Sequence, residues 1–307
     1  MRIAVTGASG FVGRHVVNAL SESHELVALS RSPVDLPIGA ENRVVPSIDS
    51  QTDWSGLLDD VDVVLHLAAR VHVMTETSED PLEEFREVNA RGTERLAHAC
   101  VQQGVKRLVF VSSIKVNGER SEGRPLTSED LPTPVDPYGI SKFEGEQALK
   151  ALSDTRNLEV VIVRPPVVYG PGVKGNIERL ARLTKVGLPL PFGSIQNRRT
   201  MLSISNMVEW LTAAMESEHV PPRPLLIGDP SPISTRDLVK WLAEGQGRRV
   251  RQLPVPIEIM RFFGRLAGKQ DMIDRLIGDL ELRPDFEQFP GVLGKLETPH
   301  EGVVRVG

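Results

Sequence analysis

The chain has 307 residues, 40% hydrophobic and 25% charged, an ordinary globular composition that suits one large α/β unit or two modest domains. Its formal net charge of -5 gives no basic footprint for binding nucleic acid or an anionic membrane surface. Cys100 is the single cysteine, which excludes an intramolecular disulfide and a cysteine-based zinc site, and we expect no metal.

The first predicted strand, residues 3–5, begins two residues after Met1 and leaves no room for a signal peptide. No apolar run approaches the roughly 20 residues that span a bilayer. We therefore expect a soluble, cytoplasmic protein with neither a membrane nor a nucleic acid as its partner.

Short apolar runs alternate with amphipathic stretches of helical length as far as about residue 170. The runs are rich in Val, Ile and Leu without clean alternation, as in parallel strands buried on both faces. The predicted strands are 3–5, 26–29, 61–67, 107–111 and 160–163, and the predicted helices include 10–21, 82–104 and 138–152. This pattern predicts an α/β fold with a Rossmann-type, doubly wound parallel sheet that binds ligands at the carboxyl ends of its strands.

Proline and glycine become frequent beyond Arg164. We predict short helices at 176–186, 205–217, 235–244 and 257–267, and a strand near 225–227 that returns to the main sheet. We interpret residues 1–170 as the sheet domain and residues 171–307 as a smaller, substrate-binding lobe. Residues 283–307 carry no clear pattern.

A glycine-rich turn links the first strand to the first helix. It reads Thr6-Gly7-Ala8-Ser9-Gly10-Phe11-Val12-Gly13. Residues without Cβ let the backbone approach a pyrophosphate, and the helix N-terminus offers free N–H groups to its oxygens. At this position the G-x-x-G-x-x-G pattern predicts a dinucleotide site formed by Gly7, Gly10, Phe11, Val12 and Gly13, rather than a plain glycine turn.

The second strand ends in Ser30-Arg31-Ser32, where dinucleotide folds place the residue that contacts the adenosine ribose. An acidic residue there would repel a 2′-phosphate, whereas Arg31 would bind one through a forked, charge-assisted contact. The sequence thus favours NADP(H) over NAD(H), with Ser30 and Arg31 at the adenosine end. NAD(H) stays open, because Arg31 could instead stack on adenine or face solvent.

Tyr138 and Lys142 begin a helix after Pro137 and share one helical face. A tyrosine hydroxyl titrates near pH 10, so it shuttles protons at neutral pH only where a neighbouring cation favours the phenolate. Ser113, at the end of the 107–111 strand, can orient the reacting oxygen. Together with the glycine turn, this set predicts hydride transfer; the alternative is a surface tyrosine beside a solvated lysine.

On these residues the chain resembles the extended short-chain dehydrogenase/reductase family, in its nucleotide-sugar epimerase, dehydratase and reductase branch. The resemblance covers roughly residues 1–285 and includes His66-Leu67-Ala68-Ala69, Val88-Asn89, Gly92-Thr93 and Tyr169-Gly170-Pro171. It implies that Tyr138 is the acid/base, that Lys142 holds the nicotinamide ribose and that Ser113 is the catalytic hydroxyl. It also implies a homodimer through the helices at 82–104 and 138–152, and a cofactor site lined by Ser47, Ile48, Leu67, Ala68, Ala69, Ser112, Pro165 and Val168.

Five residues are candidates for the substrate side of the site. They are Arg70, Lys115, Asn176, Phe192 and Arg199. Asn176 begins a helix whose N–H groups suit a diphosphate, Phe192 could stack on uracil, and Arg199 corresponds to a phosphate-binding arginine of the family. A helix cap, a core aromatic and a surface charge are their respective alternatives.

Three reactions compete within this branch of the family. The family's dehydratases carry Asp-Glu just after the catalytic hydroxyl, and Ile114-Lys115 at these positions argues against dehydration. The phrases at 66–74 and 164–174 resemble bacterial enzymes that act on UDP-linked, N-acetylated 6-deoxyhexoses for surface polysaccharide. Since Arg31 favours an exchangeable NADPH, 4-keto reduction is preferred, with a 4-epimerase that retains NAD as the alternative and a non-catalytic sensor as a remote one.

Three departures from the family pattern weaken any transfer of sugar specificity. Val167 stands where many members carry Asn, and Asn117 stands where many carry Tyr. The tryptophan usual near the C-terminus is absent from residues 291–295.

Overall fold

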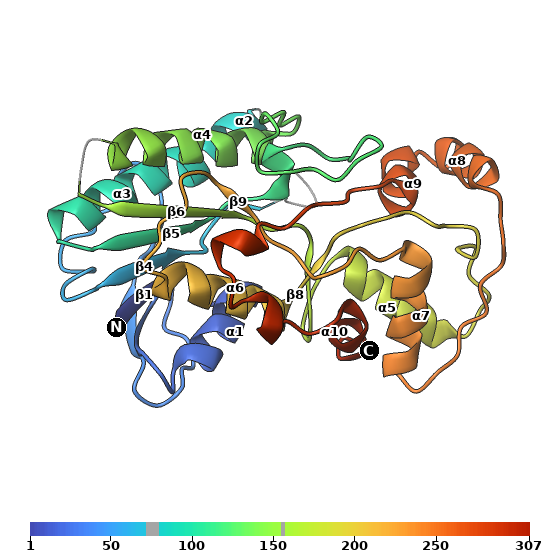
Figure 1. Ribbon diagram of the computed structural model, residues 1–307, viewed down its shortest axis with the longest axis horizontal. Coiled ribbons are helices and arrows are strands. Elements are labelled where there is room, and N and C mark those ends of the chain that lie inside the picture. Colours follow the sequence, from blue (N-terminus) through green and yellow to red (C-terminus); the bar gives the residue numbers. More distant parts are fainter. Residues whose placement is uncertain (72–79, 155–156) are drawn as a thin grey trace.

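A seven-stranded parallel sheet forms the centre of the computed structural model, which describes residues 1–71, 80–154 and 157–307 (Figure 1). Its strand order is β3-β2-β1-β4-β5-β6-β9. The strands are β1 (Arg2–Thr6), β2 (Glu25–Ser30), β3 (Glu41–Val44), β4 (Val63–His66), β5 (Arg107–Val111), β6 (Glu159–Arg164) and β9 (Leu225–Leu226). The predicted Rossmann-type sheet, with its returning last strand, is confirmed.

Helices cover both faces of the sheet (Figure 1). On one face lie α1 (Phe11–Leu20) and α6 (Ile204–Glu216); on the other lie α2 (Pro81–Arg86), α3 (Gly92–Gln102) and α4 (Pro137–Ser153). Successive strand residues face opposite layers, so Ile3 and Val5 belong to the core under α1 and α6, and Ala4 to the core under α3 and α4. This double burial explains the continuous apolar runs in the sequence.

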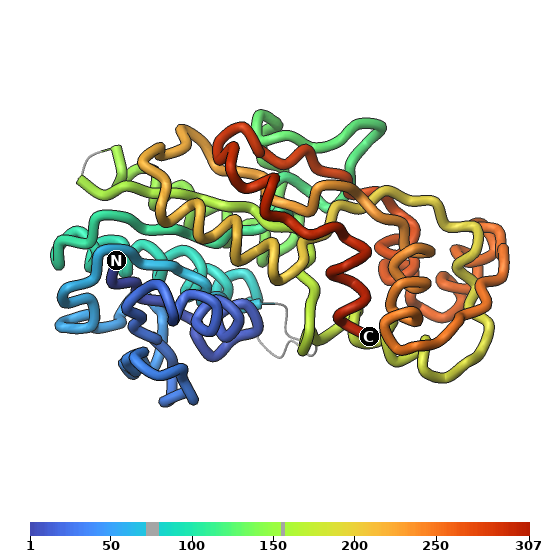
Figure 2. Tube along the Cα trace, turned by 60° about the horizontal axis from the view of Figure 1, so that its bottom comes forward, coloured from blue at the N-terminus to red at the C-terminus, as the bar shows by residue number. Residues whose placement is uncertain are grey.

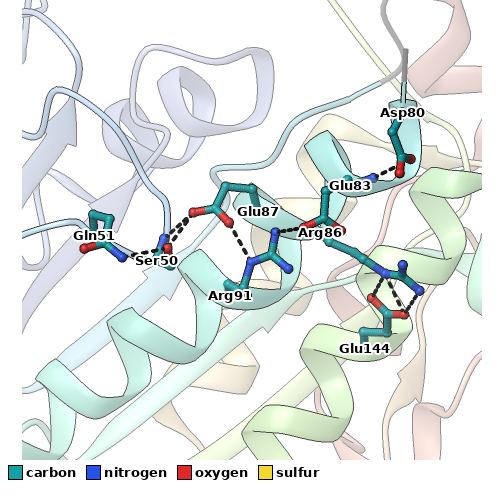
Figure 3. A network of polar contacts seen from close by, with 8 residues as sticks. All are labelled: Ser50, Gln51, Asp80, Glu83, Arg86, Glu87, Arg91 and Glu144. Carbon is teal, nitrogen blue, oxygen red and sulfur yellow. Dashed lines mark hydrogen bonds and ion pairs between the residues drawn. The ribbon is translucent and has the colours of Figure 1, made fainter. Parts of the chain in front are cut away.

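The stretch predicted as one helix at 82–104 is interrupted by a π-helical turn, η1 (Glu87–Arg91), between α2 and α3. Charged side chains form hydrogen bonds and ion pairs within and beside this turn (Figure 3). Glu87 accepts hydrogen bonds from the Ser50 backbone N–H and hydroxyl and from Arg91. Arg86 forms a forked pair with Glu144 of α4. The apolar period alone did not reveal the extra residue of this turn, because π turns depend on such local contacts.

The smaller lobe contains α5 (Asn176–Val186), α7 (Thr235–Gly245), α8 (Ile257–Leu266) and α9 (Gln270–Ile277), with α10 (Pro299–Val304) beside α7 (Figure 1). Two short strands, β7 (Val168–Tyr169) and β8 (Leu202–Ser203), pair where this lobe meets the sheet domain. The lobe has its own core, which includes Leu180, Phe192 and Leu238.

Not all of the range 171–307 lies in this lobe. Helix α6 and strand β9 belong to the sheet domain, because Trp210 and its neighbours pack against the sheet. The C-terminal segment returns along α6, and Phe286 and Phe289 lie with their ring centroids 5.3 and 6.4 Å from that of Trp210 (Figure 2). Short 3₁₀ turns are η2 (Ile114–Val116), η3 (Phe286–Gln288) and η4 (Leu293–Lys295).

None of the helices in the described parts of the chain has the length and apolar character needed to cross a membrane. The phrase at 66–74 is described only as far as residue 71, so its residues 72–74 lie outside the described ranges.

Candidate active site

The glycine turn at the carboxyl end of β1 is a cradle that has no room for side chains. Gly7 has a φ of +70°, and a Cβ there would lie 2.8 Å from the backbone nitrogen of Ala68. A Cβ on Gly13 would lie 2.2 Å from the Gly7 carbonyl oxygen. Gly10 caps α1 without a side-chain hydrogen bond, which leaves the N–H groups of its first turn for a ligand. This geometry fits the pyrophosphate of a dinucleotide.

The residues predicted to contact the adenosine of the cofactor lie at the carboxyl ends of β2 and β3. The Ser30 hydroxyl donates to the Ser32 carbonyl at 2.6 Å. Arg31 is exposed and makes no hydrogen bond or ion pair with any described residue, so its guanidinium can turn toward a ligand. Ser47 and Ile48 follow β3, where the Ser47 carbonyl accepts from Thr52 at 3.1 Å. The contact of these four residues with the adenosine stays a prediction.

Helix α4 presents Tyr138 to Ser113. The carboxylate of Asp136 caps the helix by accepting the Gly139 N–H at 2.7 Å, and Pro137 occupies the first turn. The Ser113 side chain lies near enough to Tyr138 to lower the phenol's pKa. Burial and the nearby charge of Asp136 outweigh this contact and raise the pKa of Tyr138 to about 12. The phenol is therefore protonated near neutral pH in this state.

Lys142 lies one turn further along α4 and is 1% exposed. Its Nζ is 4.0 Å from the centroid of the Phe110 ring. Burial lowers the pKa of Lys142 to about 7, while the charge of Glu146 opposes this shift. An ammonium so weakly solvated can act strongly on a neighbouring phenolate or ribose hydroxyl.

Neutral hydrogen bonds order the strand ends beneath this pair. His66 is fully buried between Thr6 and Thr93, whose hydroxyls lie 2.6 and 3.1 Å from its two ring nitrogens. Burial and the charge of Lys142 lower the pKa of His66 to about 3, so this ring is neutral. Asn89 of the π turn holds the backbone of Arg70 and donates to Ser141 at 3.0 Å. These uncharged side chains support the strand ends around the site.

A cavity of about 860 Å³ lies between the sheet domain and the smaller lobe. It brings together the catalytic candidates Ser113 and Tyr138 and four of the five substrate-side candidates, Lys115, Asn176, Phe192 and Arg199. Arg70 does not line this cavity: its guanidinium lies 5.6 Å from the Phe85 ring centroid and 3.7 Å from Glu84. The prediction that Arg70 contacts substrate has no support from this arrangement.

The four substrate-side residues that line the cavity differ in how they are held. Lys115 is paired with Asp136 and, at 3.3 Å, with Glu119. Arg199 donates to the Gly278 carbonyl at 3.0 Å, and burial lowers the pKa of its guanidinium. Phe192 belongs to the lobe core and shows the cavity only part of its surface. Asn176 begins α5 as expected.

Sequence reasoning missed a buried polar cluster behind the site. The Ser112 hydroxyl, expected beside the cofactor, donates instead to the carboxylate of Glu146. Glu146 also accepts two hydrogen bonds from Arg164, which donates to Asn117 at 2.9 Å. The spacing of Lys142 and Glu146, one helical turn, was the available signal.

Cavity-lining cations were also missed. They are Lys174, Arg179, Lys269 and Arg275, which come from α5, the segment before it, and the α8–α9 region. Among the described residues, no cluster of three or more His, Cys, Asp or Glu is arranged to hold a metal ion.

The parallel sheet, the glycine cradle and the arrangement of Ser113, Tyr138 and Lys142 are those of a nicotinamide-dependent enzyme of the extended short-chain dehydrogenase/reductase class. More narrowly, the chain belongs to the NAD dependent epimerase/dehydratase family, whose model matches residues 3–228.

Curated relatives and solved structures support this assignment. The chain is 42% identical over 285 residues to the UDP-glucose 4-epimerase of Vibrio cholerae, covering 91% of this chain and 86% of the relative. MoeE5, solved in complex with UDP-glucuronic acid and NAD, is 30% identical with a TM-score of 0.76, covering 100% of this chain and 97% of its own. The UDP-N-acetylglucosamine 4-epimerase from Bacillus cereus, at 22% identity and a TM-score of 0.77, covers 99% and 97% and shows the fold alone.

The 42% identity to the Vibrio cholerae UDP-glucose 4-epimerase favours the 4-epimerase alternative over the 4-keto reduction that the sequence preferred. They confirm a NAD(P)-dependent enzyme family, and the sensor alternative is thereby set aside. The preference for NADP(H) drawn from Arg31 stays a prediction.

Proposed function

We propose that the chain is a UDP-hexose 4-epimerase that retains NAD(H). The observation that carries the proposal is that Ser113 and Tyr138 line a cavity that also contains basic side chains, with Lys142 buried one turn further along α4. The chain is also 42% identical to a protein named UDP-glucose 4-epimerase. Arg199, Lys174 and Arg179 supply positive charge for a diphosphate, and the N-terminus of α5 lies in the same wall.

In this reaction Tyr138 acts from its phenolate form, which the Lys142 ammonium and the positive charge of a bound, oxidised nicotinamide would favour over the protonated phenol. The phenolate accepts the proton of the sugar C4 hydroxyl and later returns it. Ser113 donates a hydrogen bond to the same oxygen, and the Lys142 ammonium stabilises the phenolate form of Tyr138. Bound NAD supplies the site that accepts hydride from C4 and gives it back. Since the hydride returns to the opposite face of C4, the 4-keto sugar must rotate within the cavity between the two transfers. Part of the cavity lining is apolar and has few groups that would hold the sugar in one orientation. It includes Val167, Met201 and Leu280.

A cofactor-free conversion assay tests the proposal. Purified protein is given UDP-glucose or UDP-N-acetylglucosamine without added nucleotide, and the C4 epimers are separated by chromatography. We expect conversion to equilibrium in both directions without net NADH formation, because the same cofactor is reused. A protein that converts neither sugar, even after NAD is added, would contradict the assignment.

Arg31 favours a second candidate, an NADPH-dependent 4-keto reductase. A free, exposed guanidinium at the end of β2 suits a 2′-phosphate, and no carboxylate occupies that position. In this case the protein should oxidise NADPH stoichiometrically with a UDP-4-keto-6-deoxyhexose. Arg31→Ala should then weaken NADPH binding about 10-fold to 100-fold and leave NADH binding unchanged. Equal weakening of both cofactors would remove the reason for this candidate.

A further inference from the structure

Helix α4 carries three functional groups on one face, one turn apart: Tyr138, Lys142 and Glu146. The first two belong to the proposed reaction. The third is 1% exposed and too deep to touch a substrate in the cavity, whose lining does not include it. A buried carboxylate is costly unless it is fully paired, so its partners indicate what it does.

The partners of Glu146 come from the strand ends that build the site. Ser112, the residue before Ser113, donates its hydroxyl to the Glu146 carboxylate. Arg164, at the end of β6, donates from Nε at 2.9 Å and from Nη2 at 2.5 Å. Its remaining Nη1 donates to Asn117, which caps the 3₁₀ turn directly after Ser113. Glu146 thus fixes the strand end that carries Ser113 relative to the helix that carries Tyr138.

Glu146, one turn beyond Lys142 on α4, is the anion whose charge acts on the Lys142 ammonium. His66 of β4 is neutral, and Phe110 of β5 offers only its ring face. Arg164 of β6 is a cation directed toward Glu146 and Asn117. On α4 itself Tyr138 is protonated, and Glu146 raises the pKa of Lys142 against the effect of burial.

We propose that Glu146 is a positioning residue of the hydride-transfer site: it anchors the Tyr138–Lys142 face of α4 to the strand ends and keeps the Lys142 ammonium charged. This inference rests on the proposed roles of Tyr138 and Lys142. It predicts that removing the carboxylate charge acts on Lys142 and not only on folding.

The direct test measures the protonation of Lys142 without any substrate. The chain contains nine lysines, so labelling with ¹³Cε-lysine gives few signals, and Lys142→Met identifies the one of interest. In the wild type this signal should titrate near pH 7, well below the roughly 10.4 of exposed lysines. In Glu146→Gln the midpoint should fall by about one unit or more. An unchanged midpoint would overturn the proposal.

The matched control is Glu144→Gln. Glu144 lies two residues before Glu146 on α4. Its carboxylate accepts hydrogen bonds from Arg86 of α2 and does not reach the buried cluster (Figure 3). Its loss removes an ion pair of similar geometry and should leave the Lys142 midpoint unchanged. Glu146→Asp keeps the charge and should keep the midpoint near 7; a fall equal to that of Glu146→Gln would overturn the countercharge role.

Turnover gives a second readout. Because a one-unit fall in the Lys142 midpoint lowers the ammonium fraction about 10-fold above that midpoint, the kcat of Glu146→Gln relative to wild type should fall as pH rises from 6 to 9. A purely structural role would lower kcat by the same factor at every pH, and that result would refute the inference. If Tyr138→Phe keeps full turnover, the proposed function fails, whatever the Lys142 midpoint shows.

Glu146→Gln leaves Arg164 buried without its counterion, so this variant could fail to fold. The double variant Glu146→Gln with Arg164→Met removes both buried charges and keeps comparable volumes. It should fold and still show the lowered Lys142 midpoint. A midpoint restored to the wild-type value in this variant would show that Glu146 serves only to neutralise Arg164, and the inference would fall.

Discussion

Gly13→Ala is the sharpest test of the cofactor cradle. In the helix interior alanine is favoured over glycine by about 1 kcal/mol, so propensity alone predicts a more stable protein. The new Cβ, however, would lie 2.2 Å from the Gly7 carbonyl oxygen and 2.8 Å from the Ala8 Cα. Both neighbours are backbone atoms, which cannot rotate away as a side chain would.

The steric cost of such overpacking is typically 1–3 kcal/mol, roughly the same size or larger than the propensity gain. We therefore expect a net loss of up to about 2 kcal/mol, seen as a fall in Tm of up to roughly 8 °C. The larger effect should fall on the ligand. The Gly7 carbonyl accepts the Gly10 N–H at 2.9 Å, so displacing it opens the turn that faces the pyrophosphate.

The assay is a fluorescence titration of NADH binding, with a thermal melt of the same sample. Gly13→Ala should weaken NADH binding about 10-fold or more, equivalent to a loss of roughly 1.4 kcal/mol. The control is Gly294→Ala in η4, where an added Cβ meets nothing within 4 Å and both readouts should match the wild type. Wild-type affinity and Tm in Gly13→Ala would refute the reasoning, because the clash would then have been absorbed at no cost.

Two further predictions concern the catalytic pair. Tyr138→Phe removes the only hydroxyl that can exchange a proton with the sugar oxygen in the proposed mechanism; kcat should fall at least about 100-fold, whereas NADH affinity in the same titration should stay within about twofold of wild type. Lys142→Met should stabilise the protein while abolishing turnover. The folded-state pKa of Lys142 is about 7 and its unfolded value about 10.4, so the unfolded chain binds the extra proton between these values. Wild-type stability should therefore rise with pH between about 7 and 10, by up to about 4 kcal/mol at most, and urea unfolding of Lys142→Met should lack this rise. A parallel pH dependence in both proteins would show that Lys142 is not the source.

The residues proposed for cofactor binding and hydride transfer were visible in the sequence because each belongs to a local pattern. Gly7, Gly10 and Gly13 follow a strand within one turn, and Tyr138 and Lys142 are separated by one helical turn. Buried parallel strands leave continuous apolar runs, which is why β1, β2, β4, β5 and β6 were predicted. Strand β3 was missed because this edge strand is polar, Glu41-Asn42-Arg43-Val44, and three of its four residues are exposed.

What the sequence by itself determined is the sheet and the glycine turn at its first strand, and it proposed Tyr138 and Lys142 as the catalytic pair, since these follow from spacings of a few residues. Only the tertiary structure decided which side chains meet across long separations. It joined Glu146 to Ser112 and Arg164, turned Arg70 toward Phe85 and away from the cavity, and assembled the cavity wall from Lys115, Arg199 and Arg275. Such contacts depend on how whole elements pack, and because packing is set by the combined shape of many residues, no short stretch of sequence records it.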